Sequence, residues 1–246
     1  KYISSKLKII SCLNINGIFV LNKNDQFLKK LVKSQNSVSS KSFEVDKNFS
    51  KSFVNDNNYL KGNHNSINAS IAITLAKKLN INDSQIKLAI KTFKGLPHRM
   101  EPIYICNKFK IINDSKSTNG ESTAAALSSF DNIFWIAGGK PKSDGIGQAQ
   151  KFLTNVVEVF LIGNSINYFV EEIKSIAPEL KINTCFTLEK ATLLAIESVI
   201  RSKLRNCVIL FSPSAASFDQ FKNYEDRGNY FKKIVNLKFD QDVIKK

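Results

Sequence analysis

The chain has 246 residues, of which 43% are hydrophobic and 23% are charged, and its formal net charge is +15. This apolar fraction is ordinary for a globular protein, so it excludes a disordered, collagen-like or disulfide-dense chain. No run approaches the roughly 18 consecutive apolar residues that a membrane-spanning helix needs, and the charged opening KYISSKLKIISC has no signal-peptide core.

The first part of the chain is irregular. Short apolar runs, LKII and GIFVLN, lie between Ser-, Asn- and Lys-rich stretches, which predicts short strands and loops around one small helix near residues 26–33. Residues 65–79 then carry a strong helical pattern, because apolar side chains recur every four residues. These side chains are Ile67, Ile71, Leu75 and Leu79.

A second helix is predicted over residues 83–93. It begins at a cap, either Asn82 or Asp83, and it stops before Gly95 and Pro97. The sequence GLPH at this point is expected to be a joint between two domains, 1–96 and 97–246.

Strands and helices alternate from residue 101 onward. Strands are predicted at 101–106, 109–114, 132–139, 157–163, 181–186 and 207–212, with helices at about 119–129, 146–154, 165–175, 188–202 and 226–236. Short continuous apolar runs that are each followed by a helix predict a mostly parallel sheet with helices on both faces, a Rossmann-like α/β fold. The first two strands are close enough in sequence to form a hairpin.

The positive charge comes almost entirely from lysine. Only four of the 36 basic residues are arginines, and the lysines are spread along the whole chain. Recognition of bases and phosphates favours arginine forks and clustered basic patches. We therefore rank a solvated basic surface above a nucleic-acid site, and we expect neither a nucleic-acid nor a membrane partner.

The four cysteines are far apart, with no CxxC pair and no nearby pair of histidines. This spacing favours neither a zinc site nor a disulfide framework. Cys106, Cys185 and Cys207 lie in apolar runs, where a small buried side chain is the simplest interpretation. A reducing cytoplasm is the expected location.

Three of the predicted strands are followed by unusually polar segments: DSKSTN at 114–119, GGKPK at 138–142 and SPSAAS at 212–217. Ligands of such sheets bind at the carboxyl ends of the strands. We expect Lys116 and Lys142 to face one crevice, with hydroxyl groups of Thr118 and Ser217 between them. Two ammonium groups beside hydroxyl donors and helix N-termini suit an anionic ligand with carboxylate or phosphate groups.

Five motifs occur in an order that resembles the Mur ligase family: HNSIN at 64–68, GLPHRME at 95–101, INDSKSTN at 112–119, AGGKPK at 137–142 and SPSAASFDQFKNYEDRG at 212–228. The resemblance runs from residue 1 to about residue 236. NDSKSTN and SPSAASFDQF point to the members that add D-glutamate. It implies that 1–96 is the C-terminal part of a central P-loop-type ATPase domain and that 97–246 is the C-terminal, amino-acid-binding domain.

The resemblance also implies an activity. The family forms amide bonds with ATP through an acyl phosphate, and the members that these motifs resemble join D-glutamate to UDP-N-acetylmuramoyl-L-alanine in peptidoglycan synthesis. Lysines and Mg²⁺ neutralise the negative charge in such phosphoryl transfer. The implied cofactors are ATP and Mg²⁺, the implied partners are these small molecules, and the implied state is a cytoplasmic monomer.

Residue roles follow from the matched motifs. Lys6 matches a catalytic lysine that helps to hold magnesium when carbamylated, although a surface lysine on a helix is the alternative. Asn65 and Asn68 match ATP-binding positions, and since they are three apart they share one helix face. An N-cap role for Asn65 is the alternative. The histidine beside them, His64, is more simply structural.

Arg99 and Asp114 also match ATP-binding positions across the domain joint. Arg99 could instead form an ion pair with Glu101 or Asp114. His98 is interpreted as either packing or functional.

The amino-acid pocket is matched by the remaining residues. Lys116 matches a catalytic lysine of the D-glutamate pocket. The resemblance implies D-glutamate-binding roles for Thr118, Lys142, Ser217 and Tyr224, with the lysines and hydroxyls on the carboxylates and Tyr224 covering the site.

Several family features are absent from the printed sequence. It contains no GxxxxGK[ST] phosphate loop, no metal-binding Glu and His upstream of Lys6, and no N-terminal domain for the UDP-sugar. Tyr224 stands where the family usually has Phe, and Ala215 or Ala216 where it usually has Cys. Because the chain also does not begin with Met, we expect a fragment that is inactive alone. The alternatives are another Mur-type or folylpolyglutamate-type ligase and, with less support, a basic nucleic-acid-binding module.

Overall fold

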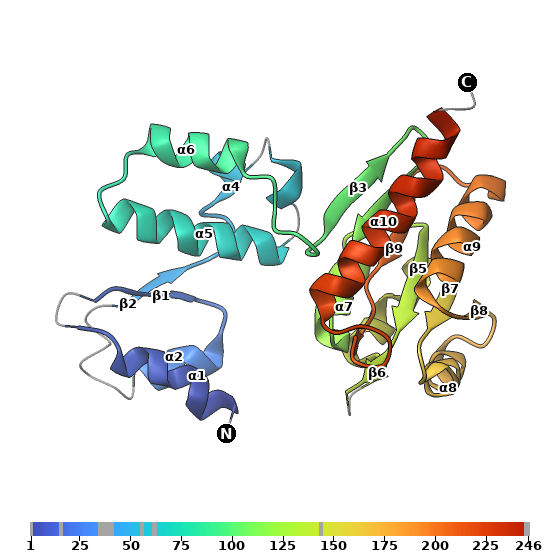
Figure 1. Cartoon of the computed structure of the whole chain (residues 1–246). Helices are drawn as coiled ribbons and strands as arrows, with labels where there is room; N and C mark the ends of the chain where they lie inside the picture. Colours follow the sequence, from blue (N-terminus) through green and yellow to red (C-terminus); the bar gives the residue numbers. More distant parts are fainter. Residues whose placement is uncertain are drawn as a thin grey trace. The chain divides into compact units, whose positions relative to one another are not determined.

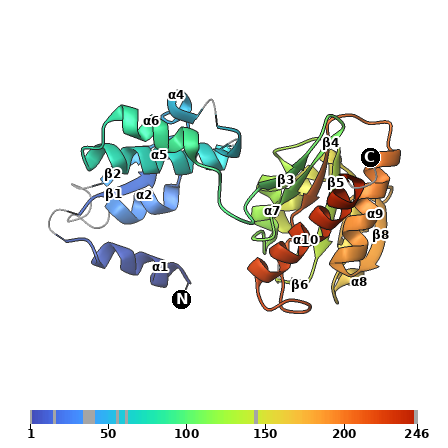
Figure 2. The same cartoon turned by 45° about the horizontal axis from the view of Figure 1, so that its top comes forward.

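The structure is a computed structural model that describes residues 2–14, 17–33, 42–54, 57–60, 63–142 and 145–243. The chain separates into two compact units, a first unit of Lys1–Lys94 and a second unit of Gly95–Lys246 (Figures 1 and 2). Within the described residues, no helix is both long enough and apolar enough to cross a membrane.

The second unit is built on a six-stranded sheet. Its strands are β3 (Glu101–Ile105), β4 (Phe109–Asn113), β5 (Ile133–Gly138), β7 (Val156–Ile162), β8 (Lys181–Phe186) and β9 (Cys207–Phe211). They lie in the order β3-β4-β9-β5-β7-β8, and all neighbours are parallel except the β3–β4 hairpin. The predicted mostly parallel α/β sheet and its hairpin are confirmed.

Helices cover both faces of this sheet, as predicted. One face carries α7 (Gly120–Leu127), the 3-10 helix η2 (Gly147–Asn155) and α8 (Ile166–Ile176); the other carries α9 (Leu188–Arg201) and α10 (Tyr224–Val243) (Figure 1). The segment predicted as a helix at 146–154 is thus a 3-10 helix. Two short strands form a separate antiparallel pair: β6 (Lys140–Pro141), which follows β5, and β10 (Ala215–Ala216), which follows β9.

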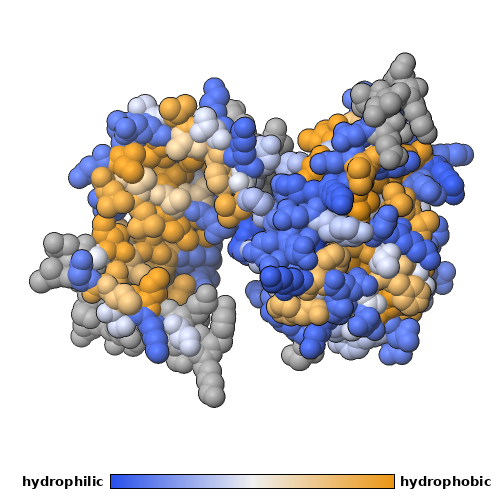
Figure 3. Space-filling view, in the orientation of Figure 1, coloured by the Kyte–Doolittle hydropathy of each residue, from blue (hydrophilic) through white to orange (hydrophobic). Residues whose placement is uncertain are grey.

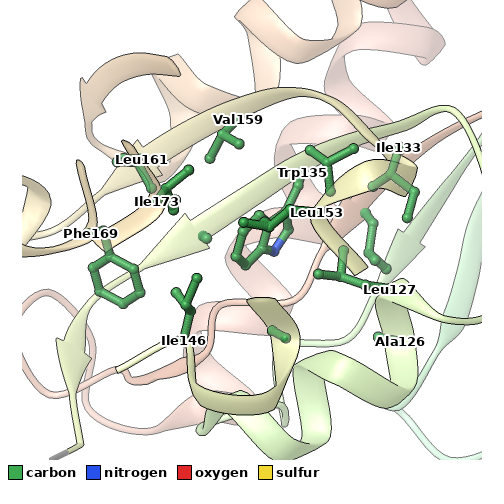
Figure 4. Packing of buried hydrophobic residues seen from close by; sticks show 14 of the residues in the cluster. Ala126, Leu127, Ile133, Trp135, Ile146, Leu153, Val159, Leu161, Phe169 and Ile173 are labelled. Carbon is green, nitrogen blue, oxygen red and sulfur yellow. The ribbon is translucent and has the colours of Figure 1, made fainter. Parts of the chain in front are cut away.

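The strand residues alternate between two hydrophobic clusters because side chains of a strand point to opposite faces. On β5, Trp135 packs with α7, η2 and α8, whereas Phe134 and Ile136 pack with α9 and α10. Figure 4 shows Trp135 surrounded by Leu153 and other buried residues of the first of these clusters. Each such fully buried side chain stabilises the unit by about 1.5–3 kcal/mol relative to its exposed form.

The first unit has one two-stranded parallel sheet and several helices. Its elements are α1 (Tyr2–Ser11), β1 (Phe19–Asn22), α2 (Gln26–Lys33), β2 (Ser42–Val45), α4 (Lys51–Val54), η1 (Asn58–Leu60), α5 (Asn63–Lys78) and α6 (Asp83–Thr92). The helices predicted at 26–33, 65–79 and 83–93 are confirmed, and Asn82 caps α6 by accepting from Gln85 N at 2.9 Å. The prediction that LKII is a strand or loop was wrong, because these residues lie in α1.

The side of α5 that is buried is not the side marked by the stripe of apolar residues that recur every four positions. Ile73 is 1% exposed and Ser70 is fully buried, whereas Leu75 is 36% and Leu79 is 68% exposed. A spacing of four overshoots the 3.6-residue turn, so the stripe rotates by about 120° between Ile67 and Leu79. The pattern therefore predicts the helix but not the side that packs within this unit.

Of the three cysteines that the sequence predicts to be buried, two are fully buried. Cys185 and Cys207 are buried, and burial raises the pKa of each thiol, that of Cys185 to about 11. Cys106 is half-buried and Cys12 is exposed. All four are free thiols, as the spacing indicates.

Candidate functional site

The three polar segments lie at one edge of the second unit's sheet. They follow β4, β9 and β5, which are adjacent parallel strands. The strand ends are in register, because Asn113 lies opposite Phe211 and Phe211 lies opposite Ile136. The predicted grouping of these three loops at a carboxyl edge is confirmed at the level of the backbone.

Asp114 ties the first of these loops to the last. Its backbone N–H donates to Phe211 O at 2.7 Å, and its Oδ2 accepts from Ser212 Oγ at 2.9 Å and Ser117 Oγ at 2.5 Å. Oδ1 accepts from Met100 N at 3.1 Å. Burial raises the pKa of Asp114 to about 6 despite these hydrogen bonds. Both carboxylate oxygens are thus engaged inside the unit.

The middle loop is held against the last loop by its glycines. Gly138 N donates to Pro213 O at 2.9 Å, and β6 then pairs with β10. Gly139 has φ of 130°, and a Cβ there would lie 2.4 Å from Ala216 O. No other residue fits this approach without moving the backbone. The GG pair of the middle segment is therefore a packing requirement of the site.

Lys116 and Tyr224 meet directly. Lys116 Nζ donates to the Tyr224 hydroxyl oxygen at 2.7 Å and lies 4.5 Å from the ring centroid. Ser115 Oγ donates to Tyr224 O at 2.9 Å, which fixes the start of α10 against the same loop. The structure thus brings together these two predicted pocket residues, although 108 positions separate them.

The other predicted pocket residues are placed on the same edge. Lys142 is exposed and follows β6, Ser217 is buried and follows β10, and Thr118 is half-buried between β4 and α7. In the β6–β10 pair, Pro141 lies opposite Ala215. That their side chains converge with Lys116 on one ligand stays a prediction.

His98 lies in a buried polar cluster beside this edge. Its Nδ1 is 3.0 Å from Asn113 Nδ2, and Glu101 Oε2 accepts from His98 N at 2.9 Å. Glu101 Oε1 accepts from Lys232 Nζ at 2.6 Å, so Glu101 forms an ion pair with Lys232, and no such pair with Arg99 is found among the described residues. Burial lowers the pKa of His98. The packing interpretation of His98 fits this environment, whereas Arg99 is exposed.

The remaining predicted ATP residues belong to the first unit. Asn65 and Asn68 lie near the start of α5, where Asn65 Nδ2 donates to Tyr59 O at 3.4 Å and Asn68 is exposed. Lys6 lies in α1, but its side chain is outside the described residues, as is that of His64. The metal-binding prediction for Lys6 is therefore untested. Over the part of the chain that the structure describes, no three His, Cys, Asp or Glu side chains cluster as metal ligands.

One residue that sequence reasoning missed lies beneath the loops. Arg227 is 1% exposed and donates to Ser115 O, Ser115 Oγ and Ala215 O. The signal was present, because Arg227 is one of only four arginines and lies inside the segment 212–228. Composition alone does not reveal that this cation is buried.

Comparison with known proteins supports the sequence resemblance. No family model matches the chain. The chain is 40% identical over 176 residues to UDP-N-acetylmuramoylalanine–D-glutamate ligase of Bartonella henselae and 37% identical over 172 residues to that of Agrobacterium fabrum. These matches cover 72% and 70% of this chain, but it spans only 37% and 36% of the two relatives' lengths.

Solved structures share the fold. MurF from Acinetobacter baumannii matches 89% of this chain and 52% of its own length, with a TM-score of 0.58 and 14% identity. UDP-N-acetylmuramate–alanine ligase MurC from Thermotoga maritima matches 72% and 39%, with a TM-score of 0.52 and 18% identity. Over the matched length, the chain is thus related to the D-glutamate-adding ligases of the Mur family and has the fold of Mur ligases.

Proposed function

We propose that the protein to which this chain belongs is an ATP-dependent ligase that adds D-glutamate to UDP-N-acetylmuramoyl-L-alanine in peptidoglycan synthesis. The observation that carries the proposal is the 37–40% identity to ligases of that name over about 72% of the chain. The chain spans just over a third of those relatives, so the activity is proposed for the whole protein.

The reaction brings several negatively charged groups together, and the cationic and hydroxyl side chains of the proposed site suit such groups. ATP supplies the phosphoryl group that converts the alanyl carboxylate into an acyl phosphate, with release of ADP. The D-glutamate amine then attacks the acyl carbon, the amide C–N bond forms, the C–O bond to phosphate breaks, and the amine loses a proton. The ligand therefore brings two carboxylates next to a phosphate.

We assign the chain's own residues as follows. Lys116 and Lys142 bind the carboxylates of D-glutamate through charge-assisted hydrogen bonds, which are shorter and stronger than neutral ones. Thr118 and Ser217 donate hydroxyl groups, and Tyr224 covers the site. The contact of Lys116 with Tyr224 at 2.7 Å supports a shared pocket for these two.

Four further residues are proposed from the matched motifs. Asn65 and Asn68 of the first unit and Arg99 and Asp114 of the second are proposed to bind ATP. Mg²⁺ is proposed to bind at Lys6 after carbamylation, which turns the ammonium into an anionic ligand. The protein is proposed to act on these small molecules as a cytoplasmic monomer, without nucleic acid.

Binding of D-glutamate to this chain tests the pocket. NMR titration of the chain is expected to show saturable binding of D-glutamate that is preferred over L-glutamate and glycine. Lys142→Ala and Thr118→Ala are expected to weaken it by about tenfold, the value of one charge-assisted hydrogen bond. Lys203→Ala is the matched control, because Lys203 is exposed and precedes β9 at the opposite edge of the sheet.

Each result of these binding measurements has a different meaning for the proposal. Equal binding of D-glutamate, L-glutamate and glycine would remove the pocket assignment. An equal loss of affinity in Lys203→Ala would show that general basic charge, and not these loops, binds the ligand. Product mass from the whole protein names the amino acid that is added, and any residue other than glutamate would overturn the proposed substrate.

A further inference from the structure

The guanidinium of Arg227 contacts the backbone of two of the three loops. Nη2 donates to Ser115 O at 2.8 Å, Nε donates to Ser115 Oγ at 3.1 Å, and Nη1 donates to Ala215 O at 3.0 Å. Ser115 immediately precedes Lys116, and Ala215 lies two residues before Ser217. The fork thus spans the loop after β4 and the loop after β9.

The third loop also lies against this group. A Cβ at Gly139 would lie 3.4 Å from Arg227 Nη1, so the backbone after β5 passes close to the guanidinium. The Phe211 ring, at the end of β9, lies with its centroid 5.7 Å from Arg227 Cζ. One side chain from α10 therefore hydrogen-bonds to two of the three segments of the proposed pocket and lies close to the third.

The charge of Arg227 is held mainly by neutral acceptors, with Asp219 as a more distant anion that favours the charged form. Its three acceptors are carbonyl and hydroxyl oxygens, and among the described residues no carboxylate oxygen lies within 4 Å of the guanidinium. Burial lowers its pKa to about 10, which still leaves it protonated at neutral pH. Burying a cation costs folding free energy, and here the three hydrogen bonds and the field of Asp219 offset part of that cost. The structural use of Arg227 is thus to hold the loop backbones together, because all three of its acceptors belong to those loops.

We infer that Arg227 is a positioning residue of the D-glutamate pocket: its planar fork sets the spacing between Lys116, Ser217 and the loop that carries Lys142. The identity of the ligand rests on the proposed function. A planar guanidinium holds its donors in a fixed geometry, whereas a lysine ammonium is a single point on a flexible stem. Lysine at this position therefore keeps the charge but cannot bridge Ser115 and Ala215 in the same way.

Arg227→Lys separates geometry from charge. It is expected to raise the dissociation constant for D-glutamate by about tenfold, to reduce the preference for D- over L-glutamate, and to speed hydrogen exchange of the loop amides by about tenfold. The Lys116 and Ser117 amides are suitable reporters, because they donate to His98 O at 3.1 Å and Asp114 O at 2.9 Å. NMR titration and exchange are measured at a temperature where each variant is folded.

Two control variants are measured beside Arg227→Lys. Arg201→Lys changes an exposed arginine of α9 that pairs with Glu197 at 3.5 Å, and it is expected to leave affinity and exchange unchanged. Ile173→Val removes one methyl group from the fully buried face of α8, so it is expected to lower the unfolding midpoint but to leave the affinity of the folded chain unchanged. A purely structural role of Arg227 predicts that Arg227→Lys behaves like Ile173→Val.

The result that overturns the inference is an Arg227→Lys chain that binds D-glutamate with wild-type affinity and selectivity. Failure of the proposed function looks different: the wild-type chain binds no D-glutamate, while loop exchange still accelerates in Arg227→Lys. If Arg227→Lys does not fold, Ser115→Ala replaces it, since it removes only the Nε acceptor and the bond to Tyr224 O. Its expected effect is about a threefold loss of affinity, and an unchanged affinity contradicts the inference.

Discussion

The two units of this chain bury their apolar residues very differently. In the second unit the sheet is covered on both faces, and Trp135, Phe160 and Ile209 are fully buried. In the first unit the described residues form one pair of strands, and Ile9, Leu79 and Leu88 are 64%, 68% and 62% exposed. Figure 3 shows hydrophobic side chains gathered on the visible face of the first unit.

The second unit gains more folding free energy from apolar burial than the first unit does. Burial on both faces of a six-stranded sheet removes large apolar areas from water, whereas a two-stranded sheet is marginal by itself. The first unit has only two small buried clusters among its described residues, one at Ile10 and Leu21 and one at Ala69, Ile73 and Ile86. We expect the second unit to be the more stable of the two.

The largest expected effect comes from a cavity in the second unit. Phe160→Ala is expected to lower the free energy of unfolding of this unit by about 3–5 kcal/mol, because the side chain is fully buried. Urea unfolding followed by fluorescence measures it, since Trp135 is the one tryptophan of the chain and lies in this unit. Ile86→Ala in the first unit is the control and is expected to leave the Trp135 transition in place. An equal shift from both variants would show that the two units unfold as one.

An intermediate effect is expected from pH. Asp114 has a folded-state pKa of about 6 against an ordinary value of 3.8, so the folded state holds its proton more tightly than the unfolded state does. Asp114 therefore stabilises the second unit fully at low pH, and this contribution, about 3 kcal/mol at most, is lost as the pH rises from about 4 to about 6. The difference in unfolding free energy between wild type and Asp114→Asn, measured by Trp135 fluorescence, should fall over that window. A pH-independent difference contradicts the assignment.

His98 is expected to act with the opposite sign. Burial lowers its pKa below 6.5, so the unfolded state takes up the proton first. The contribution of His98 to stability is therefore lost as the pH falls below its ordinary value. His98→Asn suits the backbone, because His98 has φ of 62° and Asn tolerates that region. His98→Asn should remove this loss of unfolding free energy at low pH, and a larger loss in the variant would contradict the predicted direction.

The smallest expected effect compares one helix cap in each unit. Asn119 caps α7 by accepting from Ser122 N at 2.9 Å, and Asn82 caps α6 by accepting from Gln85 N at the same distance. Each change to Ala is expected to cost about 1 kcal/mol. Only Asn119→Ala should move the Trp135 transition, whereas Asn82→Ala should change the helical circular dichroism alone. Equal shifts of the Trp135 transition would erase the contrast between the units.

Local pattern was sufficient for most of the second unit. Apolar runs such as NIFWIAGG and CVILFS predict β5 and β9 within one or two residues, because parallel strands buried on both faces are apolar without interruption. The first unit was harder. LKII lies in α1, and the stripe that ends at Leu79 does not mark the buried side of α5, since both outcomes depend on which surfaces meet.

The sequence by itself determined the α/β order, the hairpin and the three polar segments, because these depend on runs of neighbouring residues. Only the tertiary structure decided that Lys116 contacts Tyr224, that Glu101 pairs with Lys232, and that Arg227 is buried under the loops. The contacts of Lys116 with Tyr224, of Glu101 with Lys232 and of Arg227 with Ser115 each join residues more than 100 positions apart. Strand order is set by packing of the whole sheet, which no local pattern encodes.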